Sequence, residues 1–533
     1  MKKTVAILLA LMMILSMVPV SLAESSNQIQ MDGFTFNKTG YPIVENGECV
    51  IKVFHELNSE CKTWDDLSFM KELSNLTGIT FEYVPVSNVE FAEKKNMSLI
   101  SGDYPDVYWC KLSNDELFTY GVEGQVLTDY TALIDEYMPN LKATYEKVEG
   151  LENSIKQIDG KIYALPYIVN TATNAETNIS YRADLAAKVG VTETPKTIEE
   201  FEAMLVAMKN GLGEDFVPML INNSMRADYY FFTSFGEEYD VDWSFKDGKL
   251  GYNRISEQYR RYLSWMNKLF SEGLLDAEHF SGTSDQRIAK LNNHLIGVCD
   301  MEALYTADSF RSEGFQLEPL QPLDSEYSTN NKLRAHNTIE LGFAAMPVTC
   351  KYPEVVARLF DIMFSEEMVG ENGLNSLSLW LGLYGTDWVF TETDGQQTYA
   401  RQIPEGVKVS SNLYANASVC HFVPPGYLYL TALPDEKQDP GQYALGRSRT
   451  LGVHAYEAWR FPDSFLLYTE EEMDVYTKFV DISTYVTNMR AQFITGTASL
   501  EKDWDTFVKN VEKMGIQDVM DVMMTSYNRM YGE

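Results

Sequence analysis

Residues 101–109 read SGDYPDVYW, and residues 160–167 read GKIYALPY. Each stretch contains a short apolar run that predicts a buried strand, is interrupted by glycine and proline, and ends in aromatic residues. In an α/β sheet the carboxyl ends of the strands form the edge at which such folds bind ligands. The two stretches therefore predict an α/β fold with aromatic side chains at a ligand-binding edge.

Strands and helices alternate around these two stretches. Apolar runs at 50–54, 79–84 and 107–109 predict strands, and the residues at 65–76 and 91–100 have helical spacing. This order is the βαβ pattern of a parallel sheet. The pattern resumes further on, with helices at 195–208, 259–272 and 353–364 and strands at 295–299 and 341–346, and the last sixty residues are helical. Because 533 residues exceed one core, we expect two lobes.

The first 23 residues read as a secretion signal. Lys2 and Lys3 precede an uncharged, mostly apolar run at 5–20, and the residues at 21–23 (SLA) include the small ones that a signal peptidase recognises. We expect cleavage after Ala23 and export to the cell surface, the extracellular space or the periplasm. The alternative is a membrane anchor. The run is shorter than the ~20 residues that a spanning helix needs, and no second apolar run follows.

The chain is strongly acidic and rich in aromatic residues. It carries 77 Asp and Glu against 43 Lys and Arg, a net charge of −34. Such a charge disfavours nucleic acid, anionic lipid and strongly anionic ligands unless a basic pocket is buried, although a solvated secreted surface accounts for most of it. The 32 Tyr and 8 Trp offer apolar faces with polar tips, which suit sugar rings as well as interfaces.

Six cysteines are scattered along the chain, at positions 49, 61, 110, 299, 350 and 420. No CxxC motif or Cys/His cluster occurs, so zinc is not predicted. Cys49 and Cys61 are the one close pair and could form a disulfide, whereas buried free thiols are expected elsewhere. Asp240, Asp242 and Asp247 gather in one stretch, but their spacing does not match an EF-hand loop. We therefore predict no metal and no cofactor.

Several stretches resemble the extracellular solute-binding proteins, family 1, of bacterial ABC importers, and in particular the large branch that serves carbohydrate uptake. Beyond 101–109 and 160–167, the likeness is carried by 181–191 (YRADLAAKVGV), 195–201 (PKTIEEF), 351–361 (KYPEVVARLFD) and 493–505 (FITGTASLEKDWD). Their order and spacing together make the resemblance specific, and it covers nearly the whole mature chain.

The resemblance implies a two-lobed α/β architecture, the type II periplasmic-binding-protein-like fold, with extra C-terminal helices. On this chain it gives a signal peptide at 1–23 and a polar N-terminal tether at 24–47. Lobe 1 comprises 48–166 and 340–383, lobe 2 comprises 167–339 and 384–468, and the C-terminal helices occupy 469–533. Glu24 stands where Gram-positive members usually carry a lipid-anchoring cysteine, so no lipid anchor is predicted.

The resemblance also implies ligand contacts on loops at the strand ends that face a cleft between the lobes. On this chain the candidates are His55, Glu56, Asn58, Trp109, Tyr167, Asn170, Asp300, Glu302 and Trp380, with Arg182, His336 and Trp388 completing the set. Sugar C–H faces stack on Trp or Tyr, while Asp, Glu and Asn bind hydroxyl groups. We expect Trp109 and Trp380 to stack on the sugar.

A structural role competes with ligand contact at several of these positions. Trp109 could belong to the core, although it ends a strand beside Lys111. Arg182 could pair with Asp184, and Trp388 fits either role. The run at 229–232 (YYFF) and Trp504, which has helical spacing with its apolar neighbours, are predicted to be core residues.

The implied function is capture of a carbohydrate, which we expect to be a neutral oligosaccharide, for delivery to ABC permease subunits by a monomer that catalyses nothing. A secreted glycoside hydrolase is one alternative. It would need two carboxylates ~5–5.5 Å or ~6.5–9.5 Å apart, which Glu56 could form with Asp300 or Glu302. A non-transport glycan-binding surface protein is the other, and such chains usually show repeats or anchor motifs that are not found in this sequence.

Overall fold

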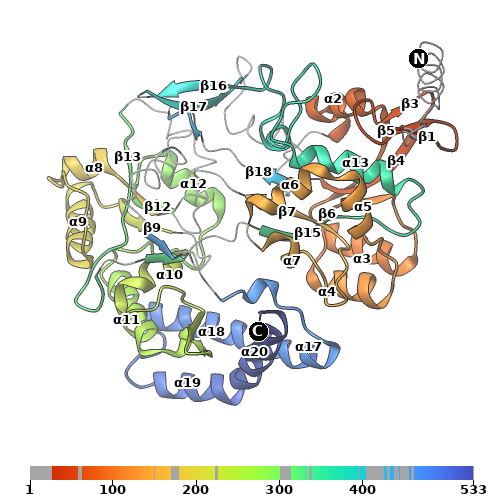
Figure 1. Ribbon diagram of the computed structural model, residues 1–533. Helices are drawn as coiled ribbons and strands as arrows, with labels where there is room; N and C mark the ends of the chain where they lie inside the picture. The colour runs from red at the N-terminus through yellow and green to blue at the C-terminus, as the bar shows by residue number, and fades with distance from the viewer. Residues whose placement is uncertain are drawn as a thin grey trace, which may run out of the picture.

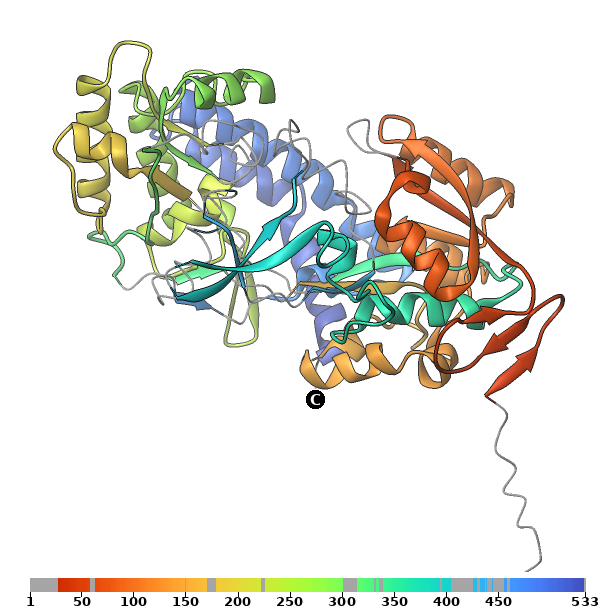
Figure 2. The ribbon, with the colours of Figure 1, turned by 90° about the horizontal axis from the view of Figure 1, so that it is seen from above.

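The computed structural model describes residues 27–57, 63–148, 150–169, 179–221, 226–300, 314–329, 332–334, 339–393, 395–403, 425–428, 432–436, 438, 443, 455–457 and 461–531. Two α/β lobes lie side by side, with the red-to-orange part of the chain in one and the yellow-to-green part in the other (Figure 1). Seen from above, the lobes are separate bodies joined near the middle of the molecule (Figure 2).

The sheet of lobe 1 has six strands in the order β18-β7-β15-β6-β4-β5. β4 runs parallel to β5 and β6, β15 runs antiparallel to β6 and β7, and β18 runs parallel to β7. The strands are β4 (Cys49–Leu57), β5 (Ile79–Ser87), β6 (Val107–Lys111), β7 (Leu165–Val169), β15 (Ile339–Ala345) and β18 (Gly426–Leu428). The parallel part is the predicted βαβ unit, and β15 returns to it after the second lobe.

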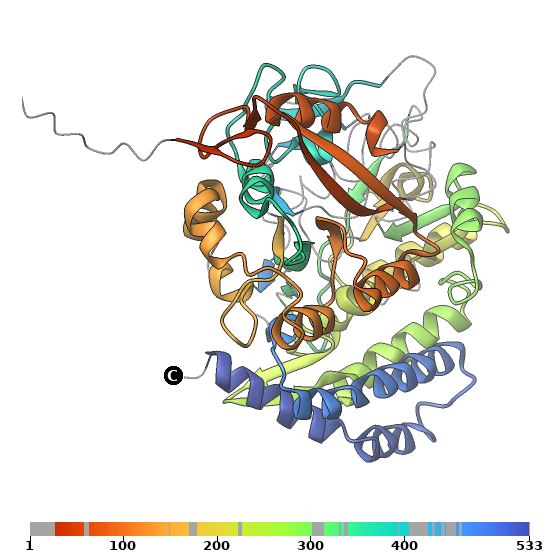
Figure 3. The same cartoon turned by 90° about the vertical axis from the view of Figure 1, so that its right-hand side faces the viewer.

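Helices cover both faces of this sheet, which Figure 3 turns toward the viewer. Side chains of α2, α5, α6 and α13 pack on one face, and Leu99 of α3 and Leu117 of α4 pack on the other. α2 ends at Gly78, which is left-handed (φ 72°) and lies so close to the Val44 carbonyl that a Cβ would clash. The helices are α2 (Ser68–Thr77), α3 (Phe91–Ser101), α4 (Asn114–Leu117), α5 (Thr131–Tyr137), α6 (Pro139–Lys147), α7 (Leu151–Ser154) and α13 (Pro353–Asp361).

The N-terminal segment is folded, so the predicted tether at 24–47 is wrong over its described part. A three-stranded antiparallel sheet forms from β1 (Gln28–Gln30), β2 (Thr35–Asn37) and β3 (Val44–Glu45). Phe34, Phe36 and Ile43 are fully buried in the core of lobe 1. Arg358 on α13 also donates a hydrogen bond to the main-chain oxygen of Asn37 at 2.7 Å. The segment looks polar in sequence because these few apolar anchors are widely spaced.

Lobe 2 contains a four-stranded sheet in the order β13-β8-β12-β9. β12 runs parallel to β9 and antiparallel to β8, which pairs antiparallel with β13. The strands are β8 (Ile179–Arg182), β9 (Val217–Leu220), β12 (Ile296–Asp300) and β13 (Leu317–Pro319), and a hairpin adds β10 (Trp243–Lys246) and β11 (Lys249–Tyr252). The helices are α8 (Ala183–Lys188), α9 (Ile198–Gly211), α10 (Arg226–Phe231), α11 (Glu257–Ser271) and α12 (Ser284–Asn292).

The C-terminal helices share the core of lobe 2 rather than forming a separate unit. They are α17 (Glu470–Tyr476), α18 (Lys478–Thr495), α19 (Trp504–Lys513) and α20 (Ile516–Tyr531). Trp504 is 5% exposed and contacts Phe493 and Phe507, so its predicted core role is confirmed. Within the described ranges, none of the helices is long and apolar enough to cross a membrane.

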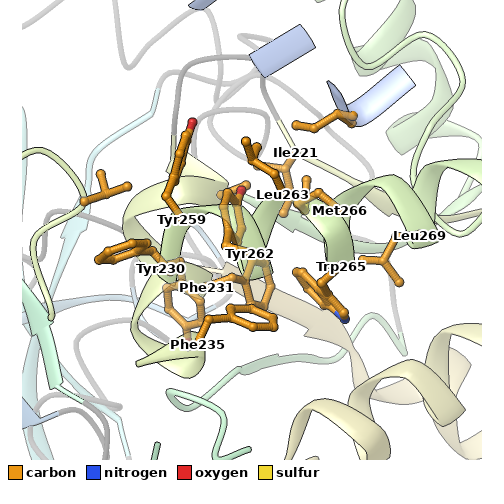
Figure 4. Close-up of a cluster of buried hydrophobic side chains, with 14 of the residues drawn as sticks. Ile221, Tyr230, Phe231, Phe235, Tyr259, Tyr262, Leu263, Trp265, Met266 and Leu269 are labelled. Carbon is orange, nitrogen blue, oxygen red and sulfur yellow. The ribbon is translucent and has the colours of Figure 1, made fainter. Parts of the chain in front are cut away.

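Figure 4 shows the aromatic centre of this core, where Phe231 and Phe235 lie near Tyr262 and Trp265. Phe231 and Phe235 contact the Trp265 ring at centroid distances of 5.0 and 5.6 Å. Tyr230, Phe231 and Phe232 are at most 1% exposed, which confirms that this aromatic run is core rather than a sugar platform.

A third sheet packs on the strand that leads out of lobe 1. It consists of β16 (Trp388–Thr393), β17 (Gln396–Arg401) and β19 (Leu433–Pro434), next to α14 (Ser378–Leu381), and its aromatic side chains pack with Tyr167 of β7. Residues 388–401 therefore lie outside the lobe 2 core, although the sequence placed 384–468 in lobe 2. A further parallel pair joins β14 (Lys332–Arg334) to β20 (Ala455–Glu457).

Candidate functional site

The candidate residues of lobe 1 stand near the carboxyl ends of the parallel strands β4 and β6. Val53 pairs with Val107 and Phe54 pairs with Tyr108, so His55 and Trp109 come next in the same register. Residues in register on neighbouring parallel strands point to the same face of a sheet. The two candidates are therefore neighbours on the face that α2 and α13 cover.

His55 is fully buried. Its ring stacks on Trp64 with the centroids 3.8 Å apart and meets Tyr83 edge-on at 5.9 Å. Nδ1 lies 3.0 Å from the main-chain oxygen of Glu56, which can only accept, so Nδ1 carries the hydrogen. Burial lowers the pKa of His55 to about 4, so the ring is neutral at pH 7 and its Nε2 atom is an acceptor.

Trp109 is 3% exposed. Its ring meets Trp64 at 5.1 Å and Phe360 of α13 at 4.8 Å, both edge-on. Because it is almost fully buried among aromatic residues, the ring packs as a core side chain, and this packing does not support the predicted stacking on sugar. Trp64 was not among the residues predicted from the sequence. The only signal for it is that a lone tryptophan stands just before the predicted helix start at residue 65.

Glu56 is half-buried at the end of β4. Burial raises the pKa of its carboxyl group, and the charge of Lys95 on α3 opposes that effect. Lys95 itself pairs with Glu116 at 2.7 Å and donates to the main-chain oxygen of Lys111 at 3.1 Å. Glu56 thus brings a carboxylate to the end of β4, where it can bind hydroxyl groups.

Tyr167 is half-buried on β7, opposite Glu340 of β15. Burial and the Glu340 charge raise its pKa, so the phenol keeps its proton and can donate a hydrogen bond. Its ring meets Phe343 edge-on at 6.2 Å. Lys111 pairs with Glu340 at 3.0 Å and lies over the Phe343 ring at 5.5 Å. A mixed aromatic and charged strip therefore crosses β7, β15 and β6.

The two tryptophans beyond the return crossing differ in packing. Trp388 is 1% exposed and its Nε1 donates to the Gly382 carbonyl at 3.2 Å, so it packs as a core residue of the third sheet. Trp380 is half-buried and meets Tyr399 edge-on at 5.7 Å. The Arg401 guanidinium lies 5.6 Å from its ring centre. Trp380 therefore keeps part of its surface open, whereas Trp388 does not.

In lobe 2, Arg182 and Asp300 end β8 and β12. The Nε and Nη2 atoms of Arg182 donate to the Asp184 carboxylate at 2.7 and 2.6 Å, and Nη1 lies 3.2 Å from His294 Nδ1. The guanidinium also stacks 4.1 Å from the Phe315 ring centre. Arg182 thus has the structural role that competed with ligand contact. Asp300 is fully buried.

The remaining candidates, Asn58, Asn170, Glu302 and His336, lie outside the described residues. So does Cys61. Cys49, Cys110, Cys299 and Cys350 are buried free thiols, so the structure does not support the predicted disulfide at Cys49.

In the acidic stretch at 240–247, aspartate side chains bind the protein's own backbone and an arginine. Asp240 Oδ1 accepts a hydrogen bond from the Asp242 main-chain nitrogen at 2.9 Å, and Asp242 pairs with Arg254 at 2.8 Å. Across the part of the chain that the structure describes, no group of three His, Cys, Asp or Glu side chains is placed to hold a metal ion.

A pocket lies between lobe 1 and the C-terminal segment, on a seam that the Asn114 side chain bridges by donating to the Ser464 carbonyl at 3.4 Å. Its lining comprises Asn114, Asp115, Phe118, Gln157 and Ile158 from lobe 1, and Asp463, Ser464, Leu466, Leu467, Tyr468, Met473 and Tyr476 from the C-terminal segment. None of the eight candidate contacts that the structure describes lines it.

Residues 64–287 match the family described as bacterial extracellular solute-binding protein. Over these residues the match agrees with the family resemblance that the sequence indicated. The fructooligosaccharide ABC transporter substrate-binding protein FusA of Streptococcus pneumoniae is 25% identical over 488 residues, which cover 86% of each chain.

Solved structures confirm the predicted fold. FusA in complex with kestose superposes with a TM-score of 0.71 at 21% identity, over 90% of this chain and 99% of that one. An HMO-binding ABC-transporter-associated solute-binding protein from Bifidobacterium longum infantis gives 0.73 at 16% identity, over 91% and 100%. The alginate-binding protein AlgQ2 gives 0.68 at 21% identity, over 92% and 100%.

Proposed function

We propose that this chain captures an oligosaccharide between its two lobes and delivers it to the permease subunits of an ABC importer. The observation that carries the proposal is the two-lobed architecture, which the chain shares over about nine-tenths of its length with a kestose complex. The half-buried aromatic residues Tyr167 and Trp380, beside the strand that leads from lobe 1 to lobe 2, supply surfaces on which sugar rings stack.

The proposed ligand is neutral or weakly charged, because the chain carries a net charge of −34. Trp380 and Tyr167 stack on the sugar, and Glu56 binds its hydroxyl groups. Asn58, Asn170, Asp300, Glu302 and His336 remain proposed contacts on the strength of the family resemblance alone. The packing of Arg182 and Trp388 leaves them out of this set.

The rest of the proposal concerns location and partners. The family match supports export, and we infer cleavage after Ala23 without a lipid anchor. The protein acts as a monomer, binds no nucleic acid and no cofactor, and releases its ligand unchanged to the permease.

The first test is a thermal-shift screen with kestose, nystose, a mannose-rich N-glycan and an alginate oligomer. Free ligand at a hundred times its dissociation constant stabilises the folded protein by ~2.7 kcal/mol, which raises the melting temperature measurably. We expect a shift with at least one neutral oligosaccharide, confirmed by calorimetry. A shift with alginate alone would contradict the neutral-ligand proposal.

The second test separates binding from catalysis. The oligosaccharide that binds is incubated with protein overnight and recovered by chromatography. We expect full recovery of intact ligand. Shorter products that disappear in a Glu56→Gln variant would instead establish the glycoside hydrolase alternative.

A further inference from the structure

The pocket on the seam between lobe 1 and the C-terminal segment has the size and walls of a small-molecule site. Its volume is about 140 Å³, close to that of a ~150 Å³ apolar cavity that binds benzene. Residues of α4 form one side, and the segment that leads into α17 forms the other (Figure 1). Much of its wall is apolar, supplied by Phe118, Ile158, Leu466, Leu467 and Met473. The pocket therefore has room for a compact apolar group of about six to eight non-hydrogen atoms.

The charge of the lining is negative on both sides of the seam. Asp115 comes from lobe 1 and Asp463 from the C-terminal segment, and the described lining contains no lysine, arginine or histidine. The two carboxylates act on one hydroxyl group. Burial raises the pKa of Tyr476 to about 12, and the charges of Asp463 and Asp115 add to that effect. Like charges that meet at one seam repel each other, and a cation placed there relieves the repulsion.

The basic side chains near the pocket are paired with other acids. Arg529 of α20 pairs with Glu472 at 2.7 Å, and Lys156 pairs with Glu152 at 2.8 Å. Asp115 is exposed, and its carboxylate forms no ion pair or hydrogen bond within the described ranges. The negative charge on the lobe 1 side of the seam is therefore available to a cation from solution.

Two buried polar side chains add acceptors to the lining. Gln157 is 5% exposed and Tyr468 is 6% exposed, and both line the pocket. The Tyr468 hydroxyl has no hydrogen-bond partner among the described residues, and its ring stacks on Tyr476 with the centroids 4.5 Å apart. The Gln157 side-chain amide forms no hydrogen bond with them either. A phenol oxygen and an amide oxygen can both accept an N–H hydrogen.

These features select one class of ligand. An anion is repelled by the two carboxylates, and a small hydrated ion gains nothing from the apolar walls. A metal ion finds no group of three His, Cys, Asp or Glu side chains placed to hold it in the part of the chain that the structure describes. An amine with an apolar body matches both the acidic groups and the walls.

We propose that the seam pocket is a second ligand site, which binds a small organic cation with an apolar body. The ammonium group pairs with Asp115 and Asp463, and the body packs against the apolar wall. Because one carboxylate comes from each side, the bound amine links lobe 1 to the C-terminal segment. The site is separate from the proposed oligosaccharide contacts, since none of the described candidates lines it.

The test is NMR on protein labelled with ¹³C at the methionine methyl groups, with no sugar present. Met473 lines the pocket, and its signal is assigned by its loss in Met473→Leu. Benzylamine should shift this signal saturably, with a dissociation constant in the ~mM range. Met204, which is 1% exposed in the lobe 2 core, should not move. Benzyl alcohol has the same size and no charge, so it should bind about three- to thirtyfold more weakly.

Substitutions locate the charge that benzylamine meets. Asp115→Asn should weaken benzylamine binding about two- to fivefold, as expected for an exposed ion pair, and leave benzyl alcohol unaffected. Asp505→Asn is the matched control, because Asp505 is also an exposed aspartate in the first turn of a helix, α19, and does not line the pocket. It removes the same net charge and should change neither affinity.

Three results would overturn the proposal. They are a Met473 signal that shows no saturable shift up to ~10 mM benzylamine, equal affinities for benzylamine and benzyl alcohol, and an Asp115→Asn protein that binds benzylamine as the wild type does. Because no sugar is present, these results leave the proposed oligosaccharide function untouched.

Discussion

The buried carboxylate of Asp228 offers a test of how the C-terminal helices are held in lobe 2. Asp228 on α10 is fully buried and pairs with Arg490 of α18 at 2.6 Å and with Arg254 at 2.5 Å. The hydroxyl groups of Tyr259 and Tyr262 also donate to it, at 3.0 and 2.8 Å. We predict that Asp228→Asn destabilises the protein strongly.

The magnitude follows from the charges that remain. Removing one partner of a buried ion pair leaves the other charge without compensation and costs ~3–5 kcal/mol. Both guanidinium groups are at most 2% exposed on their side chains, so water does not reach them to offset the loss. Arg254 still pairs with Asp242 at 2.8 Å, so its charge keeps part of its compensation. Arg490 joins α18 to α10 through this carboxylate, so we expect α18 to loosen.

The assay is urea unfolding of the ligand-free protein followed by tryptophan fluorescence and circular dichroism. The exposed pair of Lys478 and Asp518, at 3.1 Å, is the matched control. Asp518→Asn should change stability by less than ~1 kcal/mol, because surface ion pairs contribute little. A loss below ~1 kcal/mol for Asp228→Asn would refute the reasoning, since it would mean that water or another anion compensates the arginines.

Three further predictions concern pH, ligand and backbone. Burial alone would raise the pKa of Asp228, but Arg490 and Arg254 outweigh burial and lower the pKa to about 2. The stabilisation by Asp228 is therefore fully present above pH ~4 and is lost as the pH falls toward 2. Acid titrations of the wild type and of Asp228→Asn should show the same stability at that pH. Trp380→Ala should weaken oligosaccharide binding ten- to a hundred-fold in calorimetry, about 1–3 kcal/mol, with unfolding unchanged. Gly342→Ala should destabilise lobe 1 by more than ~1 kcal/mol in urea unfolding, because φ is 93° and a Cβ would lie 2.0 Å from the Leu112 carbonyl oxygen. An unchanged midpoint of the urea unfolding curve would count against this backbone argument.

The parts of the fold that were predictable are those that local periodicity encodes. The parallel strands β4, β5 and β6 and the glycine end of α2 at Gly78 all have short-range signals, and the structure confirms each of them. The N-terminal sheet was missed because its anchors, Phe34, Phe36 and Ile43, are spaced by turns and not by a regular period. Its stability comes from long-range packing on α13, which no local pattern announces.

The candidate site was less predictable, for a related reason. A tryptophan at a strand end fits both a cleft and a core, and the choice depends on which helices cover that face. For Trp109 the covering residue Phe360 lies some 250 residues away in the chain, so its burial could not be inferred from the strand itself. Arg182 shows the opposite case. Its partner Asp184 is two residues away, and the sequence named that pair as the competing role.

His55 shows why packing alone does not account for every buried residue type. A core histidine needs partners for both ring nitrogens, yet the described residues supply only one, the Glu56 carbonyl at Nδ1. A phenylalanine at this position would stack on Trp64 without leaving an acceptor in an apolar wall. The residue types at 55 and 109 therefore carry more polarity than packing alone requires. This surplus distinguishes both positions from Trp388, whose indole already has a carbonyl partner.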